Sequence, residues 1–254
     1  MARKIDVSFI IVFYSKRKRL SNLLTSISNL KTRYAFEIIV VNNSPKKISL
    51  LKKVRLIDNK ENVGYARGNN LGAKKALGRY LYILNPDTKL FRNSLDFLVS
   101  FLEKNRRYGV CAPALFDGKG NYLEQINSKT ITPLRYILFN TFLGKVFKPL
   151  DEKKRFGEVE VVAGSAFLIR RGLFRKLGGF DEQFFLYFEE NDLCKRVLAM
   201  GYKIFIEEKA KVVHFWIKKE NKRHKNIFKK SRDYYFEKHY GKLASKVVGF
   251  FSDI

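Results

Sequence analysis

Apolar positions in the first third of the chain follow two different periods. The run VSFIIVFY (7–14) is continuous in β-branched and aromatic residues, which predicts a strand buried on both faces of a parallel sheet. Residues 20–30 and 65–77 instead carry apolar side chains at helical spacing. Further apolar runs occur at 36–43, 54–59 and 80–87. The order of strand, helix, strand, strand, helix, strand predicts a doubly wound α/β sheet.

The rest of the chain continues this pattern with less regularity. We expect a helix over 93–103, a strand over 109–116 followed by a turn, a strand over 159–171 and a helix over 190–200. Residues 130–155 show no clear period. There we expect a loop with some helix that can move over the ligand-binding edge of the sheet.

Composition changes at Lys218, after which basic residues dominate. An apolar stripe on a short basic helix is formed by Leu243, Ala244, Val247, Val248 and Phe251. We therefore predict one folded domain over 1–217 and a basic helical extension over 218–254. The stripe either lies in the headgroup layer of a membrane or packs against the domain or a second subunit, and the sequence leaves both open.

Charge and cysteine content narrow the class of protein. The chain has 51 Lys and Arg against 24 Asp and Glu, a formal net charge of +27, which favours binding to nucleic acid, an anionic membrane face or a phosphorylated substrate. The two cysteines, Cys111 and Cys194, lie far apart and have neither disulfide nor zinc-site spacing. With no apolar run of about 20 residues and no secretion signal, we expect a cytoplasmic protein.

Polar residues at the ends of the predicted strands are candidates for ligand binding, because open α/β sheets bind ligands beyond the carboxyl ends of their strands. Tyr14, Asn42 and Asn43 hold such positions. Asn85 and Asp87 follow another strand, and the proline between them ends the ladder and leaves Asp87 at the rim. A carboxylate there suits a divalent cation bound to phosphate, although an ordinary Pro-Asp turn gives the same pattern.

Glycines and asparagines cluster in NVGYARGNNLG (62–72), just before a predicted helix. Glycines allow backbone to approach a ligand and asparagines can bind hydroxyls, but a helix-capping turn has the same composition. The candidates in this stretch are Asn62, Gly64, Gly68 and Asn69. Gly164, in the predicted strand AGSAFLIRR, either contacts a ligand or allows close packing.

Five carboxylates fall within a dozen residues of this basic chain, at Asp181, Glu182, Glu189, Glu190 and Asp192. The last three begin a predicted helix, where the helix dipole favours negative charge. Acidic neighbours can also raise the pKa of a carboxyl and make it a general base. His214 ends another strand and is either a metal ligand or a structural residue.

In this order the motifs resemble the family 2 glycosyltransferases, in particular the rhamnosyltransferase-like branch. The resemblance covers Ile5 to Gly241 and is carried by VSFIIVFYSKRKRL, FEIIVVNNS, NVGYARGNNLG, YLYILNPDT, VAGSAFLIRRGLFRKLGGFDEQFFLYFEENDLCKRV and GYKIFIEEKAKVVHF. It implies a GT-A fold with a Rossmann-like, mostly parallel sheet over 1–217, a nucleotide-diphosphate sugar donor such as dTDP-rhamnose or a UDP-sugar, Mg²⁺ or Mn²⁺, and inversion at the anomeric carbon.

The resemblance also assigns roles to residues of this chain. Tyr14, Asn42 and Asn43 would face the nucleotide, although the family usually has aspartate where Asn42 stands. Asp87 ends what resembles the family's Asp-x-Asp metal motif, with Asn85 in place of the first acid, and His214 would supply another ligand. The remaining expected donor contacts are Asn62, Gly64, Gly68, Asn69 and Gly164.

The family's Glu-Asp-x-Asp pattern corresponds here to 189–192. Its catalytic base maps to Glu190, a longer carboxylate than the usual aspartate, with Glu189 beside it and Asp192 as the alternative base. The acceptor would be a saccharide or lipid-linked hydroxyl in polysaccharide or glycolipid assembly, and a homodimer is compatible with the apolar stripe.

Three rival interpretations remain. A nucleotidyltransferase would carry a Gly-rich loop after the first strand, and FYSKRKRL contains no glycine. A nucleic-acid-binding protein would explain the charge, but no helix-turn-helix, RRM or zinc-finger pattern is present and the carboxylate cluster would have no role, so we expect no nucleic-acid partner. Departures from the family pattern at Asn42, Asn85 and Glu190 leave a catalytically inactive homologue open.

Overall fold

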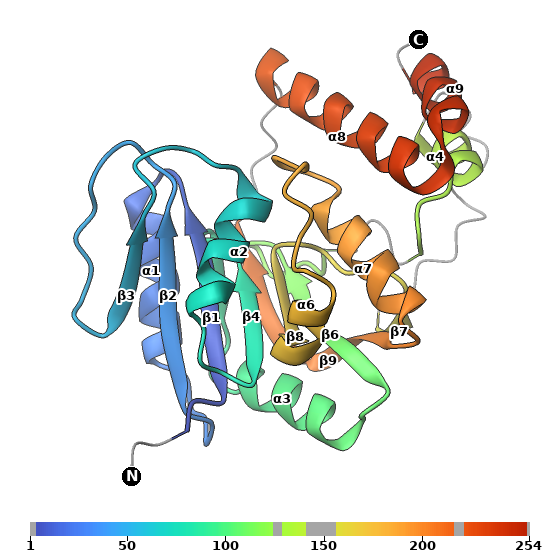
Figure 1. Ribbon diagram of the computed structural model, residues 1–254. Helices are drawn as coiled ribbons and strands as arrows, with labels where there is room; N and C mark the ends of the chain where they lie inside the picture. The colour runs from blue at the N-terminus through green and yellow to red at the C-terminus, as the bar shows by residue number, and fades with distance from the viewer. Residues whose placement is uncertain (1–3, 124–128, 141–155, 216–220, 253–254) are drawn as a thin grey trace.

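A single nine-stranded sheet forms the centre of the computed structural model, which describes residues 4–123, 129–140, 156–215 and 221–252 (Figure 1). The strands are β1 Val7–Phe13, β2 Phe36–Asn42, β3 Val54–Asp58, β4 Tyr80–Leu84, β5 Thr88–Leu90, β6 Tyr108–Phe116, β7 Gly157–Val159, β8 Ala166–Arg170 and β9 Lys203–His214. Their order is β3-β2-β1-β4-β8-β6-β9-β5, with β7 also paired to β9. Strands β1, β2, β3, β4, β6 and β9 run in one direction and β5, β7 and β8 in the other. The predicted mostly parallel α/β sheet is confirmed.

Helices cover both faces of the sheet (Figure 1). Their bounds are α1 Arg17–Ser28, α2 Tyr65–Lys75, α3 Ser94–Lys104, α4 Pro133–Asn140, α6 Arg171–Lys176, α7 Glu189–Ala199, α8 Lys222–Tyr240 and α9 Lys242–Ser252. The apolar sides of α1 and α3 form one core with alternate residues of β1, such as Phe9 and Ile11. The intervening residues Ile10 and Val12 belong to a second core with α2, α6 and α7. Strand β1 is therefore buried on both faces, as its continuous apolar run predicted.

The predicted single strand over 159–171 is wrong, because the chain changes partners in this segment. β7 ends at Val159 after pairing with β9, whereas β8 begins at Ala166 and lies between β4 and β6. The residues between the two strands therefore run from beside β9 to the position between β4 and β6. In doing so they bring Ser165, whose carbonyl accepts a hydrogen bond from the Asn85 amide at 2.8 Å, to the end of β4.

The basic C-terminal region is helical, as predicted, and packs onto the rest of the molecule. Helix α8 lies above α7, and α4 and α9 lie beside its C-terminal end (Figure 1). Tyr235 and Phe236 of α8 are fully buried in the second core, as is Val248 of α9. Within the described ranges, no helix combines the length and hydropathy needed to cross a membrane. Of the predicted loop over 130–155, the part at 141–155 lies outside the described residues.

Candidate active site

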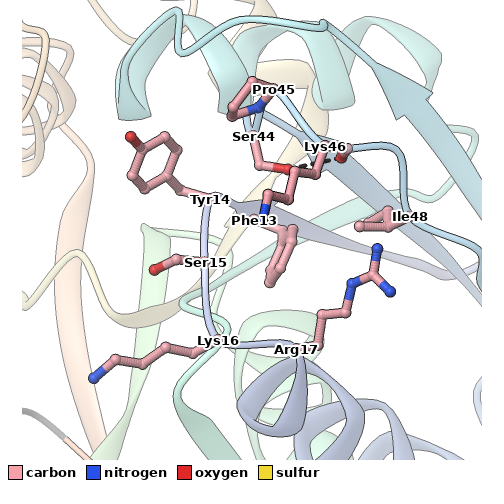
Figure 2. A pocket seen from close by; sticks show the side chains of 9 residues that line it. All are labelled: Phe13, Tyr14, Ser15, Lys16, Arg17, Ser44, Pro45, Lys46 and Ile48. Carbon is pink, nitrogen blue, oxygen red and sulfur yellow. Dashed lines mark hydrogen bonds between the residues drawn. The ribbon is translucent and has the colours of Figure 1, made fainter.

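The carboxyl ends of β1 and β2 form a pocket of about 330 Å³. Its lining residues are Phe13, Tyr14, Ser15, Lys16, Arg17, Ser44, Pro45, Lys46 and Ile48. The loop after β1 and the loop after β2 supply its two walls (Figure 2). The Tyr14 side chain is 47% exposed at the rim. Three lining residues are cationic and none is acidic, so the pocket suits a ligand that combines an apolar ring with negative charge.

The side-chain amides of Asn42 and Asn43 form hydrogen bonds with other groups of the protein. The Asn42 side chain is fully buried; its Nδ2 donates to the Lys46 carbonyl (2.9 Å) and to Asp58 Oδ1 (3.0 Å), and its Oδ1 accepts from Ser44. Because the Asp58 carboxylate is a direct partner, an aspartate at 42 would bring two negative charges together. The amide at Asn42 thus holds the loop that forms one wall of the pocket.

Asn43 connects the strand ends to the segment before α2. Its Nδ2 donates to the Gly64 carbonyl at 2.9 Å, and its Oδ1 accepts from Asn59 Nδ2 at 2.8 Å. Asn62 lies at the same junction, where its Oδ1 accepts from the Gly64 amide at 3.1 Å. These hydrogen bonds position the loops. That Asn43 and Asn62 also contact a nucleotide stays a prediction.

The two glycines proposed as ligand contacts in this stretch lie where side chains do not fit. Gly64 has φ +88°, and a Cβ there would lie 2.7 Å from the Phe185 carbonyl oxygen. A Cβ on Gly68 would lie 2.9 Å from Val12 Cγ1, so this glycine lets α2 pack closely on β1. Asn69 is fully buried; its Nδ2 donates to the Tyr65 carbonyl, and its Oδ1 has no hydrogen-bond partner in the described chain.

Asp87 and His214 are 127 positions apart in sequence and adjacent in the fold, because β5 pairs with the end of β9. His214 Nε2 lies 3.3 Å from Asp87 Oδ1, and Arg19 Nη1 lies 3.0 Å from Asp87 Oδ2. Burial alone would raise the pKa of Asp87, but the hydrogen bond with His214 and the nearby Arg19 charge lower it. Asp87 is therefore an ionised carboxylate at the rim of the sheet.

This pair fits a divalent cation whose other ligands come from outside the protein. A carboxylate oxygen and an imidazole nitrogen are suitable donors, and Mg²⁺ in phosphate-binding sites usually takes only one or two protein ligands. Within the residues that the structure describes, no group of three or more His, Cys, Asp or Glu side chains could hold a metal by itself. Asn85, two residues before Asp87, contributes its carbonyl to Thr88, whose amide lies 3.2 Å away.

Glu189 and Glu190 are the first two residues of α7. Glu189 is buried, and its Oε2 has no hydrogen-bond partner in the described chain. Burial and the neighbouring Glu190 raise the pKa of Glu189 well above its usual range. Burial also raises the pKa of Glu190 to about 7. A Cβ on Gly164 would be only 3.5 Å from Glu190 Cβ, so the small residue leaves room for the Glu190 side chain.

Asp192, less than one turn along the same helix, has an arginine, a lysine and a histidine as partners. Its Oδ2 lies 2.7 Å from Arg196 Nη2, and its Oδ1 lies 2.6 Å from Lys238 Nζ and 2.9 Å from His239 Nε2. The side chain is fully buried, which alone would raise its pKa, but these partners lower the pKa to about 2. Both carboxylate oxygens of Asp192 are paired with these side chains. Its contacts are those of a structural ion pair and not those of a general base.

Tyr65 and Asn70 are site residues that the sequence did not single out. The Tyr65 hydroxyl donates to the Gly164 carbonyl at 2.6 Å. Burial raises the pKa of Tyr65, and the carboxylates of Glu189, Glu190 and Asp87 raise it further. The predicted base and the predicted metal ligand thus both disfavour ionisation of the Tyr65 hydroxyl.

Asn70 fastens α2 to the segment before the acidic helix. Its Nδ2 donates to the Phe180 carbonyl (2.8 Å) and to Glu182 Oε1 (3.0 Å), while its Oδ1 accepts from the Phe180 amide (2.9 Å). The asparagine-rich composition of 62–72 pointed to this stretch, but only the fold shows that Asn70 is the residue with this role.

Known proteins resemble this chain in sequence and in fold. The sequence model described as "Glycosyl transferase family 2" matches residues 8–178. The Low-salt glycan biosynthesis hexosyltransferase Agl10 of Haloferax volcanii is 28% identical over 204 residues, covering 75% of this chain and 61% of that protein. Rhamnosyltransferase WbbL of Escherichia coli is 24% identical over 161 residues, 60% of this chain and 61% of that protein. The chain thus spans less than two thirds of these two relatives.

A third relative covers more of both proteins. The N-acetylglucosaminyl-diphospho-decaprenol L-rhamnosyltransferase of Mycobacterium tuberculosis is 25% identical over 229 residues, 81% of this chain and 74% of that protein. Among solved structures, GalNAc-T7 with UDP, GalNAc and Mn²⁺ has a TM-score of 0.64 at 18% identity, covering 93% of this chain and 50% of that one. The mannosyltransferase PcManGT from Pyrobaculum calidifontis in complex with GDP-Man and Mn²⁺ has a TM-score of 0.63 at 15% identity, covering 98% and 70%.

Proposed function

Since the chain belongs to glycosyl transferase family 2, we propose that it moves a sugar from a nucleoside-diphosphate donor to an acceptor hydroxyl in glycan assembly. Its fold is the GT-A fold of the matching transferase structures, as the sequence predicted. The names of the relatives, hexosyltransferase and rhamnosyltransferase, support a hexose or deoxyhexose donor such as dTDP-rhamnose or a UDP-sugar. The acceptor is a saccharide or a lipid-linked sugar.

The donor nucleotide occupies the pocket at the ends of β1 and β2 in this proposal. Tyr14 offers an aromatic face to the base, since stacking contributes about 1–3 kcal/mol per base. Lys16, Arg17 and Lys46 offer positive charge to the diphosphate. Matching structures contain UDP or GDP-mannose, which supports this class of ligand.

Asp87 and His214 would hold Mg²⁺ or Mn²⁺, the cation class present in the matching structures. When bound, such a cation neutralises the negative charge that develops on a departing diphosphate. Asp87 contributes to this by remaining ionised at neutral pH, because its pKa is lowered. Arg19, 3.0 Å from the other Asp87 oxygen, fixes the orientation of that carboxylate.

Glu190 is the general base of the proposed reaction, and its environment is the observation that carries the proposal. A carboxyl with a pKa of about 7 is half ionised near neutral pH and can accept a proton efficiently. It would take the proton of the acceptor hydroxyl while that oxygen forms a bond to the anomeric carbon. The bond from that carbon to the diphosphate oxygen breaks on the opposite face, and a single displacement inverts the configuration.

Thermal stabilisation by nucleotides tests donor binding. UDP, GDP and dTDP, each with and without Mn²⁺, should be compared, and we expect one base to raise the melting temperature in a metal-dependent way. Tyr14→Ala should weaken that binding about tenfold. Phe97→Ala is the matched control, because Phe97 is 37% exposed on α3 and lies outside the pocket.

Turnover of the corresponding nucleotide sugar then tests the enzyme. Release of the diphosphate in the presence of an acceptor supports transfer. Nucleotide binding without turnover of any donor would favour an inactive homologue. If no nucleotide stabilises a folded sample, the transferase proposal is wrong.

A further inference from the structure

Helix α9 presents an apolar ridge to solvent. Leu243, Val247 and Phe250 are 77%, 40% and 67% exposed. At about 100° per residue these three positions fall on one side of the helix, whereas the buried Ser245 and Val248 fall on the other. The packed side of α9 contacts α8 and α4, so the ridge is additional exposed apolar surface. Helix α9 itself lies at one end of the molecule (Figure 1).

Positive charge accompanies the ridge. Lys242 and Lys246 are exposed on the same helix, and α9 contains no acidic residue. One turn separates these lysines, which places both along one flank of the ridge. Long lysine side chains can keep their ammonium groups at a polar boundary while their stems follow apolar residues into it. An apolar ridge with a cationic flank complements a surface that has anionic groups at its boundary with water and an apolar layer beneath them.

We propose that the α9 ridge docks on the surface of an anionic lipid bilayer, with α9 lying in the plane of the headgroups. Leu243 and Phe250 enter the boundary between headgroups and acyl chains, and Lys242 and Lys246 bind lipid phosphates. The net charge of +27 draws the whole molecule toward such a surface. The inference does not rest on the proposed transferase activity, because it uses none of the site residues.

Two other occupants fit the ridge less well. A second copy of α9 would bring four lysines together with no acid on either helix to offset them, and an 11-residue helix is only about 16 Å long. Stable dimers bury about 800 Å² per partner, far more than three side chains supply. A nucleic acid would bind the lysines but leave Leu243 and Phe250 in contact with water.

Vesicle flotation of the purified full chain tests the proposal. Vesicles of phosphatidylcholine mixed with phosphatidylglycerol are compared with vesicles of phosphatidylcholine alone. We expect binding to the anionic vesicles and little to the neutral ones. Leu243→Ser with Phe250→Ser should weaken that binding by about tenfold or more. Lys242→Gln with Lys246→Gln should weaken it by about fivefold for each lysine.

Matched controls come from the loop between β2 and β3. Leu51 is 71% exposed and is followed by the exposed pair Lys52 and Lys53, so Leu51→Ser and Lys52→Gln with Lys53→Gln repeat the chemistry at a distant site. These variants should bind vesicles like the unaltered protein. All variants replace exposed side chains, and unchanged melting temperatures and nucleotide binding will show that fold and donor site are intact.

Three outcomes would overturn the proposal. The first is no binding to anionic vesicles by a sample whose cooperative thermal unfolding shows that it is folded. The second is binding that the lysine variant weakens and the Leu243 and Phe250 variant does not, which would indicate general adhesion of a basic protein. The third is a dimer in lipid-free solution that Leu243→Ser with Phe250→Ser dissociates, which would assign the ridge to a second copy.

Discussion

The first turn of α7 holds buried carboxyl groups in two different environments, and their pKa values shift in opposite directions. Among the described residues no ion pair joins Glu189 or Glu190 to a cation, and burial raises the pKa of both. Asp192 is fully buried as well, yet Arg196, Lys238 and His239 lower its pKa to about 2. The partners, and not the depth of burial, decide whether a carboxyl here holds a charge or exchanges a proton.

Two of the three partners of Asp192 come from α8, which lies in the basic C-terminal region. This region therefore supplies the charge that keeps Asp192 ionised, while Glu190 two residues earlier keeps a pKa suited to proton transfer. The dense acidic stretch of this basic chain thus divides into an ion cluster around Asp192 and a pair of carboxyls with raised pKa values. Each prediction below tests that division.

Removing the charge of Asp192 should have the largest effect. Asp192→Asn removes the carboxylate that Arg196, Lys238 and His239 share and leaves Lys238 with Asp181 alone. Breaking a buried ion cluster in this way costs about 3–5 kcal/mol. Urea denaturation at neutral pH measures the change in the free energy of unfolding. A variant as stable as the unaltered protein would remove the structural half of the comparison.

Asp181→Asn is the control for that experiment, since Asp181 Oδ2 also lies 2.7 Å from Lys238 Nζ. Its side chain is partly exposed, and we expect a loss of at most about 1 kcal/mol.

Acid should reproduce the loss of stability expected for Asp192→Asn. A folded-state pKa of about 2, below the usual 3.8, contributes stability above pH 4 that is lost as pH falls toward 2.

Glu190→Gln should slow transfer by roughly 10² or more, as expected when a general base is lost. The amide has nearly the same size, so nucleotide binding and the melting temperature should remain close to those of the unaltered protein. Single-turnover rates with a donor that the protein binds are the measurement. If the slowing is under about tenfold, which is about 1.4 kcal/mol of barrier, the base lies elsewhere.

The pH dependence of transfer separates the two environments without a mutation. Only the ionised form of Glu190 accepts a proton, so the rate should reach half of its plateau at about pH 7 and level off about one pH unit above that. At pH 6 we expect about one tenth of the plateau rate. If Asp192 were the base, its pKa of about 2 would make the rate independent of pH across this range.

The fold could be predicted where the signal is local. The strands β1, β2, β3 and β4 end within three residues of the ends of their apolar runs, because each is a buried segment bounded by polar or turn residues. The break at residues 160–165 could not be predicted, since it depends on β7 and β8 pairing with different strands. The three-residue β5 was also missed, because pairing with β9 defines it and its own sequence does not.

The candidate site was predicted in outline and not in its contacts. The ends of the strands drew attention to Asp87 and His214, but their 3.3 Å approach depends on the register of β5 and β9. The spacing of Asp192 and Arg196, four residues apart on a helix, could have predicted their ion pair. Nothing local links Lys238 to Asp192, because α8 reaches α7 only through tertiary packing.

Glu189→Gln should have the smallest effect of these changes, although Glu189 is as deeply placed as Asp192. Its raised pKa favours the protonated form of the carboxyl, and a protonated carboxyl and an amide are both neutral and similar in size. We expect the free energy of unfolding to change by less than about 1 kcal/mol. The midpoint of the rate profile should stay near pH 7, because a neutral neighbour exerts no charge on Glu190. Paired measurements with Asp192→Asn decide the point: equal losses of stability, or a midpoint displaced to lower pH, would mean that Glu189 carries charge and that the two environments are not opposites.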